Sequence, residues 1–162
     1  MKWNILKTKK VIKISEIKVY LAGAMEAHEG TDYAKQWRDT VKEYFNKFTE
    51  NIEVISPTDY YEYGKNYNYT EMEVFNFDLR KVKESNVILV DLNNIRKSIG
   101  TCMELKEAYT YNIPVIGFLD SELQNKDIIQ LIHPWVYCCC DRIETGTNSI
   151  KKAISYIKDY YQ

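Results

Sequence analysis

The stretch that decides the fold is Asn86-Val87-Ile88-Leu89-Val90-Asp91-Leu92, near the middle of the 162-residue chain. Its centre is an unbroken aliphatic run from Val87 to Val90, with Asn86 before it and Asp91 after it. Such continuous apolar runs are typical of parallel strands that helices cover on both faces. The stretch therefore predicts a buried central strand in an α/β domain.

Outward from this strand, apolar runs alternate with helical patterns. The spacing of apolar residues predicts further strands over residues 17–23, 52–56, 114–119 and 135–140, and helices over 32–48, 70–84, 101–111 and 147–161. This alternation predicts an α/β, flavodoxin-like doubly wound sheet of five mainly parallel strands, in the order 2-1-3-4-5, with helices on both faces. Ligands of such sheets bind beyond the carboxyl ends of the strands, which directs attention to the loops after the first three strands.

Composition and charge narrow the classes of protein. The net charge is −1, and the sequence gives no sign of the basic surface that nucleic-acid binders present. No nucleic acid polymer is therefore expected as a partner. No apolar run approaches the roughly 20 residues of a membrane span, and no leader pattern opens the chain, so we expect a cytoplasmic protein without a membrane partner. We interpret residues 1–16 as an N-terminal extension and 17–162 as a single domain.

Cysteine, histidine and glycine spacing gives no sign of a metal or a cofactor. Three of the four cysteines are adjacent, Cys138 to Cys140, which does not suit disulfide geometry and favours a buried strand in a reducing compartment. The two histidines, His28 and His133, are far apart, and no glycine run matches a dinucleotide fingerprint or a P-loop. We expect neither a metal site nor a bound cofactor.

Glu104 is the first candidate for chemistry, at the end of the run Ser98-Ile99-Gly100-Thr101-Cys102-Met103-Glu104. In the first turn of the predicted helix, the positive end of the helix dipole would favour an ionised carboxylate, the form that attacks an anomeric carbon. The alternative is structural, because Thr101-x-x-Glu104 is also a capping-box pattern.

Two more acidic residues and a glycine stand near the expected ligand edge. Asp78, on the helix before the central strand, could serve as a second carboxylate that protonates a leaving base; the alternative is a solvated helix face. Asp91 ends the central strand, and its alternative is a turn residue that bonds its own backbone. Gly23 permits close approach of backbone and ligand after the first strand, or serves simple turn geometry.

Ser98, Gly100 and Thr101 form a loop of small residues that enters a helix. Backbone N–H groups and hydroxyls in such a loop can hold a phosphate. The alternative is an ordinary helix start, which has a similar composition.

Together and in this order, these pieces resemble the nucleoside 2-deoxyribosyltransferase superfamily over about residues 17–119. The pieces are Val19-Tyr20-Leu21-Ala22-Gly23, Trp37-Arg38, Ser56-Pro57, Asp78-Leu79, Ser85 to Asp91, Gly100-Thr101-x-x-Glu104 and Pro114-Val115. The resemblance implies a flavodoxin-like fold, no metal, and a glutamate nucleophile that forms a glycosyl–enzyme intermediate. It places Glu104 at the nucleophile, Tyr20 at the tyrosine that positions it, and Asp78 at the acid that assists proton transfer.

Two departures from the family pattern bear on the substrate. Ser98 stands where the transferases often have an aspartate, and a serine there resembles the related nucleoside 5'-monophosphate N-glycosidases, in which it contacts the phosphate. Residues 24–30, however, contain two glutamates and no arginine, whereas those hydrolases have an arginine-rich phosphate loop. The residues thus leave nucleoside and 5'-monophosphate open.

The resulting hypothesis is cleavage of the N-glycosidic bond of a nucleoside or nucleotide through a glycosyl-Glu104 intermediate, which a second base or water resolves. One alternative is a monophosphate hydrolase that uses Ser98 for the phosphate; another is a non-catalytic nucleotide-binding module; a third is a flavin or signalling module. Because family sites borrow residues from a partner subunit, the resemblance also implies a homodimer or higher homo-oligomer, with helix faces such as Val74-Phe75 and Phe77 as contacts.

Overall fold

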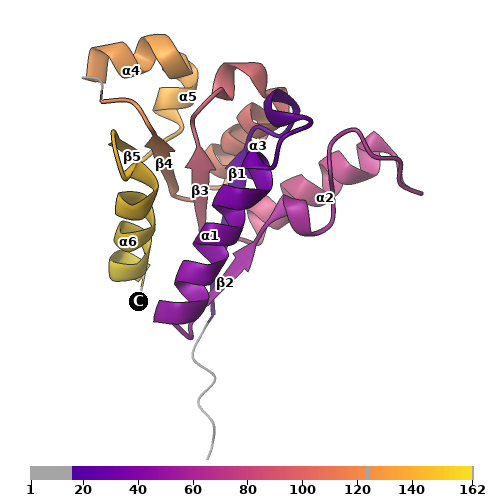
Figure 1. Ribbon diagram of the computed structural model, residues 1–162, viewed down its shortest axis with the longest axis horizontal. Helices are drawn as coiled ribbons and strands as arrows, with labels where there is room; N and C mark the ends of the chain where they lie inside the picture. Colours follow the sequence, from indigo (N-terminus) through magenta and orange to yellow (C-terminus); the bar gives the residue numbers. More distant parts are fainter. Residues whose placement is uncertain (1–15, 123–124, 162) are drawn as a thin grey trace, which may run out of the picture.

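The computed structural model describes residues 16–122 and 125–161, so most of the predicted N-terminal extension, residues 1–15, lies outside the described part. The strands form one parallel sheet in the order β2-β1-β3-β4-β5, which confirms the predicted order (Figure 1). Their bounds are β1 Ile17–Gly23, β2 Ile52–Ile55, β3 Val87–Asp91, β4 Val115–Leu119 and β5 Arg142–Thr145.

Helices cover both faces of this sheet. They are α1 Tyr33–Phe48, α2 Glu71–Lys83, α3 Ile99–Thr110, α4 Asn125–Ile132, α5 Pro134–Cys138 and α6 Ser149–Tyr161, with short 3₁₀ turns at Glu26–His28, Pro57–Asp59 and Ile95–Lys97. One apolar core joins the sheet to α1 and α6, and a second joins its other face to α2, α3, α4 and α5. Within the described residues, no helix is long and apolar enough to cross a membrane.

The helix predicted over 70–84 is present, and so is its cap. The Thr70 hydroxyl accepts a hydrogen bond from the Glu73 N–H at 3.2 Å, and the Glu73 carboxylate accepts one from the Thr70 N–H at 2.6 Å. Both partners of this capping box satisfy donors that the helix would leave free. The box therefore fixes where α2 begins.

The predicted strand at 135–140 is wrong. Residues 134–138 form α5, because Pro134 occupies its first turn and the His133 ring accepts a hydrogen bond from the Trp135 N–H. The last strand is β5, whose Arg142 and Glu144 side chains bond each other at 2.6 Å. The three adjacent cysteines accordingly lie in and after a helix, with Cys138 exposed.

Parallel pairing brings the carboxyl ends of β1 and β3 together. In the register of the two strands, Tyr20 lies opposite Ile88 and Gly23 lies opposite Asp91. β2 ends beside β1 on its other side and leads into the loop before α2. Three predicted loops therefore meet at one edge of the sheet.

Candidate active site

A cavity of about 280 Å³ lies at this edge of the sheet. Its walls come from the end of β1, the loop after β2, helix α2 and the start of α3. Six of the residues expected from the sequence line it: Gly23, Asp78, Ser98, Gly100, Thr101 and Glu104. Tyr20 and Asp91 are fully buried and lie behind the lining.

Glu104 is the most buried acid in the lining, with 9% of its surface exposed. The Tyr20 hydroxyl, on β1, donates a hydrogen bond of 2.6 Å to Glu104 Oε1. Burial raises the pKa of Glu104 to about 8, against the opposing effects of the Tyr20 hydrogen bond and the Arg38 guanidinium; the nearby Asp78 carboxylate raises it further. The site therefore holds a carboxyl group whose charge is poorly solvated.

The surroundings of Glu104 differ from those expected in one respect. Helix α3 begins at Ile99, earlier than predicted, because the Ser98 side chain caps it by accepting from the Thr101 N–H. Glu104 is thus in the second turn, where the helix dipole acts weakly, and it takes no part in the cap. Its position depends on Tyr20.

Asp78 lies on α2 and is the second carboxylate of the cavity. The Tyr60 hydroxyl donates a hydrogen bond of 2.6 Å to Asp78 Oδ1. Burial raises the pKa of Asp78, while the Tyr60 hydrogen bond and Arg38 oppose that rise. Each carboxylate thus has its own tyrosine, but the sequence does not identify Tyr60 among the many tyrosines of its loop.

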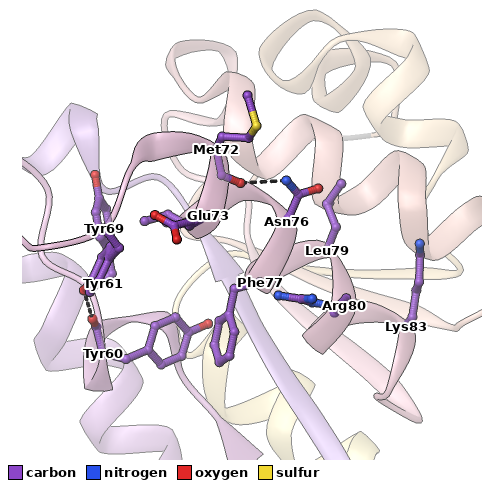
Figure 2. Close-up of a pocket in the computed structure, with 11 residues that line it drawn as sticks. Tyr60, Tyr61, Tyr69, Met72, Glu73, Asn76, Phe77, Leu79, Arg80 and Lys83 are labelled. Atoms are coloured by element: carbon purple, nitrogen blue, oxygen red, sulfur yellow. Dashed lines mark hydrogen bonds between the residues drawn. The ribbon is translucent and has the colours of Figure 1, made fainter.

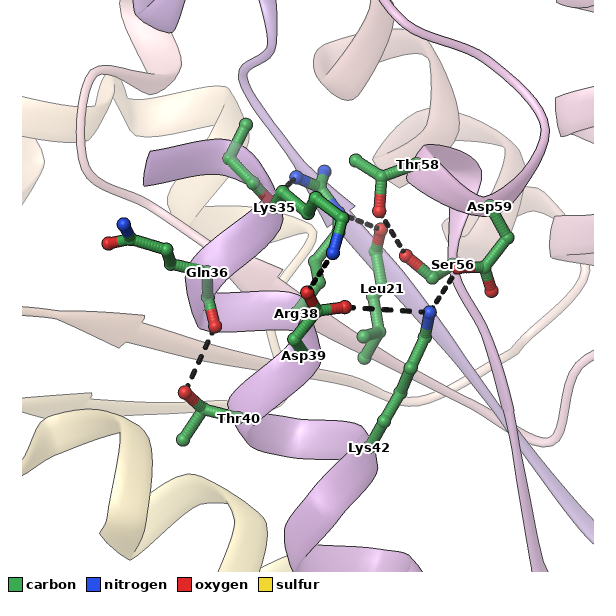
Figure 3. Close-up of polar contacts among 11 residues, drawn as sticks. Leu21, Lys35, Gln36, Arg38, Asp39, Thr40, Lys42, Ser56, Thr58 and Asp59 are labelled. Atoms are coloured by element: carbon green, nitrogen blue, oxygen red, sulfur yellow. Dashed lines mark hydrogen bonds and ion pairs between the residues drawn. The ribbon is translucent and has the colours of Figure 1, made fainter. Parts of the chain in front are cut away.

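Arg38 is a fully buried cation on α1 that sequence reasoning did not place in the site. Its guanidinium donates to the carbonyl oxygens of Ala34 at 2.7 Å and Gly23 at 2.9 Å. It also donates to the Leu21 carbonyl at 3.4 Å (Figure 3). The bonds to Leu21 and Gly23 hold the charge against the end of β1, where it opposes the rise that burial causes in the pKa of both cavity carboxylates. The dipeptide Trp37-Arg38 was a sequence signal for this position, although it did not reveal the role.

The small residues predicted to form a loop lie at the start of α3, with Ser98 as its N-cap and Gly100 and Thr101 in its first turn, and this segment is closed by its own hydrogen bonds. The Ser98 and Thr101 hydroxyls lie 2.8 Å apart, and both side chains are buried. Gly100 leaves open space, since a Cβ there would meet no atom within 4 Å. The Ser98 hydroxyl is therefore engaged with Thr101.

Asp91 bonds the backbone of its own turn, which was the structural alternative to a role in ligand binding. Asp91 Oδ1 accepts from the Asn93 backbone N–H at 2.9 Å and from its side-chain amide at 2.7 Å. Asp91 Oδ2 is buried without a hydrogen-bond partner among the described residues, and burial raises the pKa of this carboxyl to about 6. The structure places Asp91 behind Gly23, not on the wall of the cavity.

The charge of the lining is mainly negative. Glu26 and Glu71 are exposed residues of the lining, in addition to Asp78 and Glu104, and Arg38 is the one cationic residue of the set. Among the residues that the structure describes, no cluster of three or more His, Cys, Asp or Glu side chains could hold a metal ion. The arrangement therefore offers paired carboxylates and hydroxyls as its chemical groups.

A larger hollow, of about 690 Å³, lies beside α2 (Figure 2). Its walls come from α2 and the loop after β2, and they include the aromatic rings of Tyr60, Tyr69 and Phe77. Its one acid, Glu73, is engaged in the helix cap. Because it lacks a carboxylate pair, we take the smaller cavity as the candidate active site.

Comparison with known proteins gives matches among solved structures. No family model matches the chain, and a search of curated proteins finds no match. A conserved protein from Enterococcus faecalis superposes with a TM-score of 0.65 and 17% identity, over 88% of this chain and 99% of the other.

Two further matches are 2-deoxyribosyltransferases. The protein from Leishmania mexicana gives a TM-score of 0.60 and 16% identity, over 90% of this chain and 99% of the other. The protein from Bacillus psychrosaccharolyticus gives a TM-score of 0.52 and 21% identity, over 75% of this chain and 89% of the other. At these identities the likeness is one of fold, and at that level it confirms the resemblance found in the sequence: the chain has the fold of the 2-deoxyribosyltransferases.

Proposed function

We propose that this chain cleaves the N-glycosidic bond of a nucleoside, with Glu104 as the nucleophile. The observation that carries the proposal is the hydrogen bond from Tyr20 to Glu104, which presents a buried carboxylate to a cavity at the ligand edge of the sheet. A second carboxylate, Asp78, lines the same cavity. The fold shared with 2-deoxyribosyltransferases supports the same chemistry.

The two carboxylates divide the reaction between them. In the ionised form, a Glu104 oxygen forms a bond to C1' of the sugar as the bond from C1' to the base nitrogen breaks. The electron pair of that bond goes to the base, and protonated Asp78 donates a proton to it. Burial raises the pKa of both groups, so the pair keeps one proton near neutral pH. In the free chain this proton lies on Glu104, whose pKa is about 8, and it must pass to Asp78 before Glu104 attacks. A second base or water then displaces Glu104 from the sugar.

The remaining candidate residues bind the substrate in this proposal. Gly23 and Gly100 let the sugar approach the backbone, while Ser98 and Thr101, on either side of Gly100 in the chain, offer hydroxyls. Asp91 acts from behind Gly23 and shapes the end of the strand. We infer no cofactor for this chemistry.

The charge of the cavity favours a nucleoside over a 5'-monophosphate. A phosphate dianion entering the cavity would meet Glu26 and Glu71, while the guanidinium of Arg38 is committed to backbone carbonyls. The alternative, a monophosphate N-glycosidase, would require Ser98 to exchange its contact with Thr101 for the phosphate. We therefore rank nucleoside cleavage first and leave the acceptor, base or water, to experiment.

A non-catalytic nucleotide-binding module is the other candidate function. A Glu104 that served only as a helix cap would have favoured it. Because Ser98 caps α3 and Glu104 faces the cavity, the arrangement supports the enzyme instead. The four free cysteines are compatible with the reducing cytoplasm expected for such an enzyme.

We further propose that two or more copies associate through α2 and α3. Met72 and Phe75 on α2 are 72% and 43% exposed, and Ile99 and Met103 on α3 are 79% and 44% exposed. Large apolar side chains gathered on adjacent helices mark protein–protein contacts. Of the faces expected from the sequence, Phe75 is exposed, whereas Phe77 packs against Tyr60.

The test is base release from a panel of nucleosides and 5'-monophosphates, with and without a free acceptor base, followed by chromatography. We expect release from nucleosides, and a fall of roughly 1,000-fold or more in Glu104→Gln, which keeps an acceptor for the Tyr20 hydroxyl. Formation of a new nucleoside would identify transfer, and release of base alone would identify hydrolysis.

A matched control is Glu107→Gln, one turn further along α3, where the glutamate pairs with Lys83 at 2.8 Å. This variant should keep wild-type activity. Absence of release from every substrate would refute the enzyme and leave the binding module. Release from monophosphates alone would assign Ser98 the phosphate.

A further inference from the structure

The Asp78 carboxylate is held at one of its two oxygens. Oδ1 accepts the 2.6 Å hydrogen bond from Tyr60, and within the described residues no hydrogen bond reaches Oδ2. Asp78 also lines the catalytic cavity. Oδ2 is therefore the atom that remains for a ligand.

Tyr60 is itself fixed by contacts around its ring and its backbone. Its ring packs edge-on against Phe77 with 4.8 Å between centroids, and its carbonyl accepts a hydrogen bond of 2.7 Å from the Tyr69 hydroxyl (Figure 2). Its N–H bonds the Pro57 carbonyl at the end of the turn Pro57–Asp59. A side chain so restrained gives its hydroxyl a defined direction.

Tyr60 is separate from the ligand side of Asp78. It lines the larger hollow beside α2, whereas the lining of the catalytic cavity includes Asp78 but not Tyr60. Tyr60 therefore acts on the substrate through the side chains beside its hydroxyl, which are Asp78, to which it donates, and the neighbouring Tyr20 and Glu104. This makes it a positioning residue and not a catalytic one.

We propose that Tyr60 positions Asp78 for proton donation, by fixing Oδ1 so that Oδ2 faces the leaving base. The proposal rests on the proposed function and extends it to a residue outside the cavity. Each carboxylate of the site is then positioned by a tyrosine hydroxyl, since Tyr20 donates to Glu104 in the same way at 2.6 Å. No other described residue bonds Asp78 Oδ1.

The hydrogen bond has a consequence that a purely structural contact would lack. A donor to a carboxylate favours the ionised form, and Tyr60 opposes the rise that burial causes in the pKa of Asp78. Without the Tyr60 hydroxyl, one of the two groups that oppose the effect of burial is lost, and the pKa of Asp78 rises further. Because the two carboxylates titrate as a pair, the pH range of activity should move upward with it.

The test is Tyr60→Phe, which removes the hydroxyl and keeps the ring that packs on Phe77. We expect kcat to fall by roughly 10- to 100-fold, the range for loss of one hydrogen bond to a charged group, and KM to change by less than about threefold. The pH profile of kcat should shift to higher pH. An NMR titration of isotope-labelled aspartate carboxyls should show a higher pKa for Asp78 in the free variant.

Tyr67→Phe is the matched control, because Tyr67 belongs to the same loop, stacks on Tyr69 and lines neither cavity. It should leave kcat and the pH profile unchanged. Equal kcat for Tyr60→Phe and wild type, or a lower kcat without any shift in the profile, would overturn the proposal.

Wild type and Glu104→Gln assayed alongside separate the two hypotheses. An active wild type and an inactive Glu104→Gln, with Tyr60→Phe at wild-type rate and pH profile, would refute the role of Tyr60 alone. An inactive wild type would refute the proposed function. The NMR titration would still decide in that case, and an unchanged Asp78 pKa in Tyr60→Phe would refute the positioning as well.

Discussion

At the scale of single residues, Glu104 combines burial with a charge that its proposed chemistry requires. Its ordinary pKa of 4.5 rises to about 8 in the folded chain, chiefly because burial removes water from the carboxylate. The hydrogen bond from Tyr20 compensates for only part of that loss. The folded protein therefore gives up stability when Glu104 ionises.

This cost predicts a pH-dependent gain in stability for Glu104→Gln. Between about pH 4.5 and pH 8 the folded chain holds a proton on Glu104 that the unfolded chain has lost, so the wild type loses stability as the pH rises through this window. Glutamine does not ionise, so at pH 8.5 the free energy of unfolding of the variant should exceed that of wild type by about 1–3 kcal/mol. Urea unfolding at pH 4.5 and pH 8.5 measures the difference, and an equal gain at both values would contradict the explanation.

The cavity residues could be predicted from the sequence more readily than the residues that hold them in place. Glu104, Asp78 and the small residues at the start of α3 stand at recognisable places relative to strands, so a pattern can find them. Arg38 and Tyr60 act through bonds to backbone carbonyls and to a carboxylate far along the chain. Such partners depend on how loops fold over the sheet, which spacing does not express.

At the scale of elements, the end of β1 is packed closely around Gly23. A Cβ on Gly23 would lie 3.0 Å from the Trp37 ring and 3.1 Å from Asp91 Cβ. We expect Gly23→Ala to lower the free energy of unfolding by about 1–3 kcal/mol, because either α1 or β3 must shift. Urea unfolding measures this, with Gly100→Ala as the control, since a Cβ there meets open space. A neutral Gly23→Ala would contradict the tight packing.

The last strand shows where patterns of elements mislead. Residues 135–140 are apolar enough for a strand, yet a proline at the first turn favours the helix that forms there. β5 contains Arg142 and Glu144 because it is an edge strand, paired with β4 alone. Edge strands carry charged residues that hide them from a search for apolar runs. The other four strands, the edge strand β2 among them, carry the apolar runs, and their predicted bounds agree with the structure within a residue or two.

At the scale of the whole molecule, the order of strands in the sheet could be predicted from the alternation of strands and helices. The association of copies could not, because it depends on the shape of the surface.

We expect wild type to sediment as a dimer or larger assembly. Ile99→Glu should shift it toward the monomer, because a charge would be buried against an apolar partner. Trp135→Glu is the control, since Trp135 is equally exposed but lies on α5. A monomeric wild type would refute the association.

The hydrogen bond between Tyr20 and Glu104 joins residues 84 positions apart in the chain. A chain emerging from the ribosome exposes Tyr20 long before Glu104 exists, and neither α1 nor β2 between them can complete the pair. Refolding must also bring these two distant segments together, and contacts over such long separations in the chain form slowly. Under the proposed function, recovery of base release after refolding would report that β1 and α3 have docked against each other.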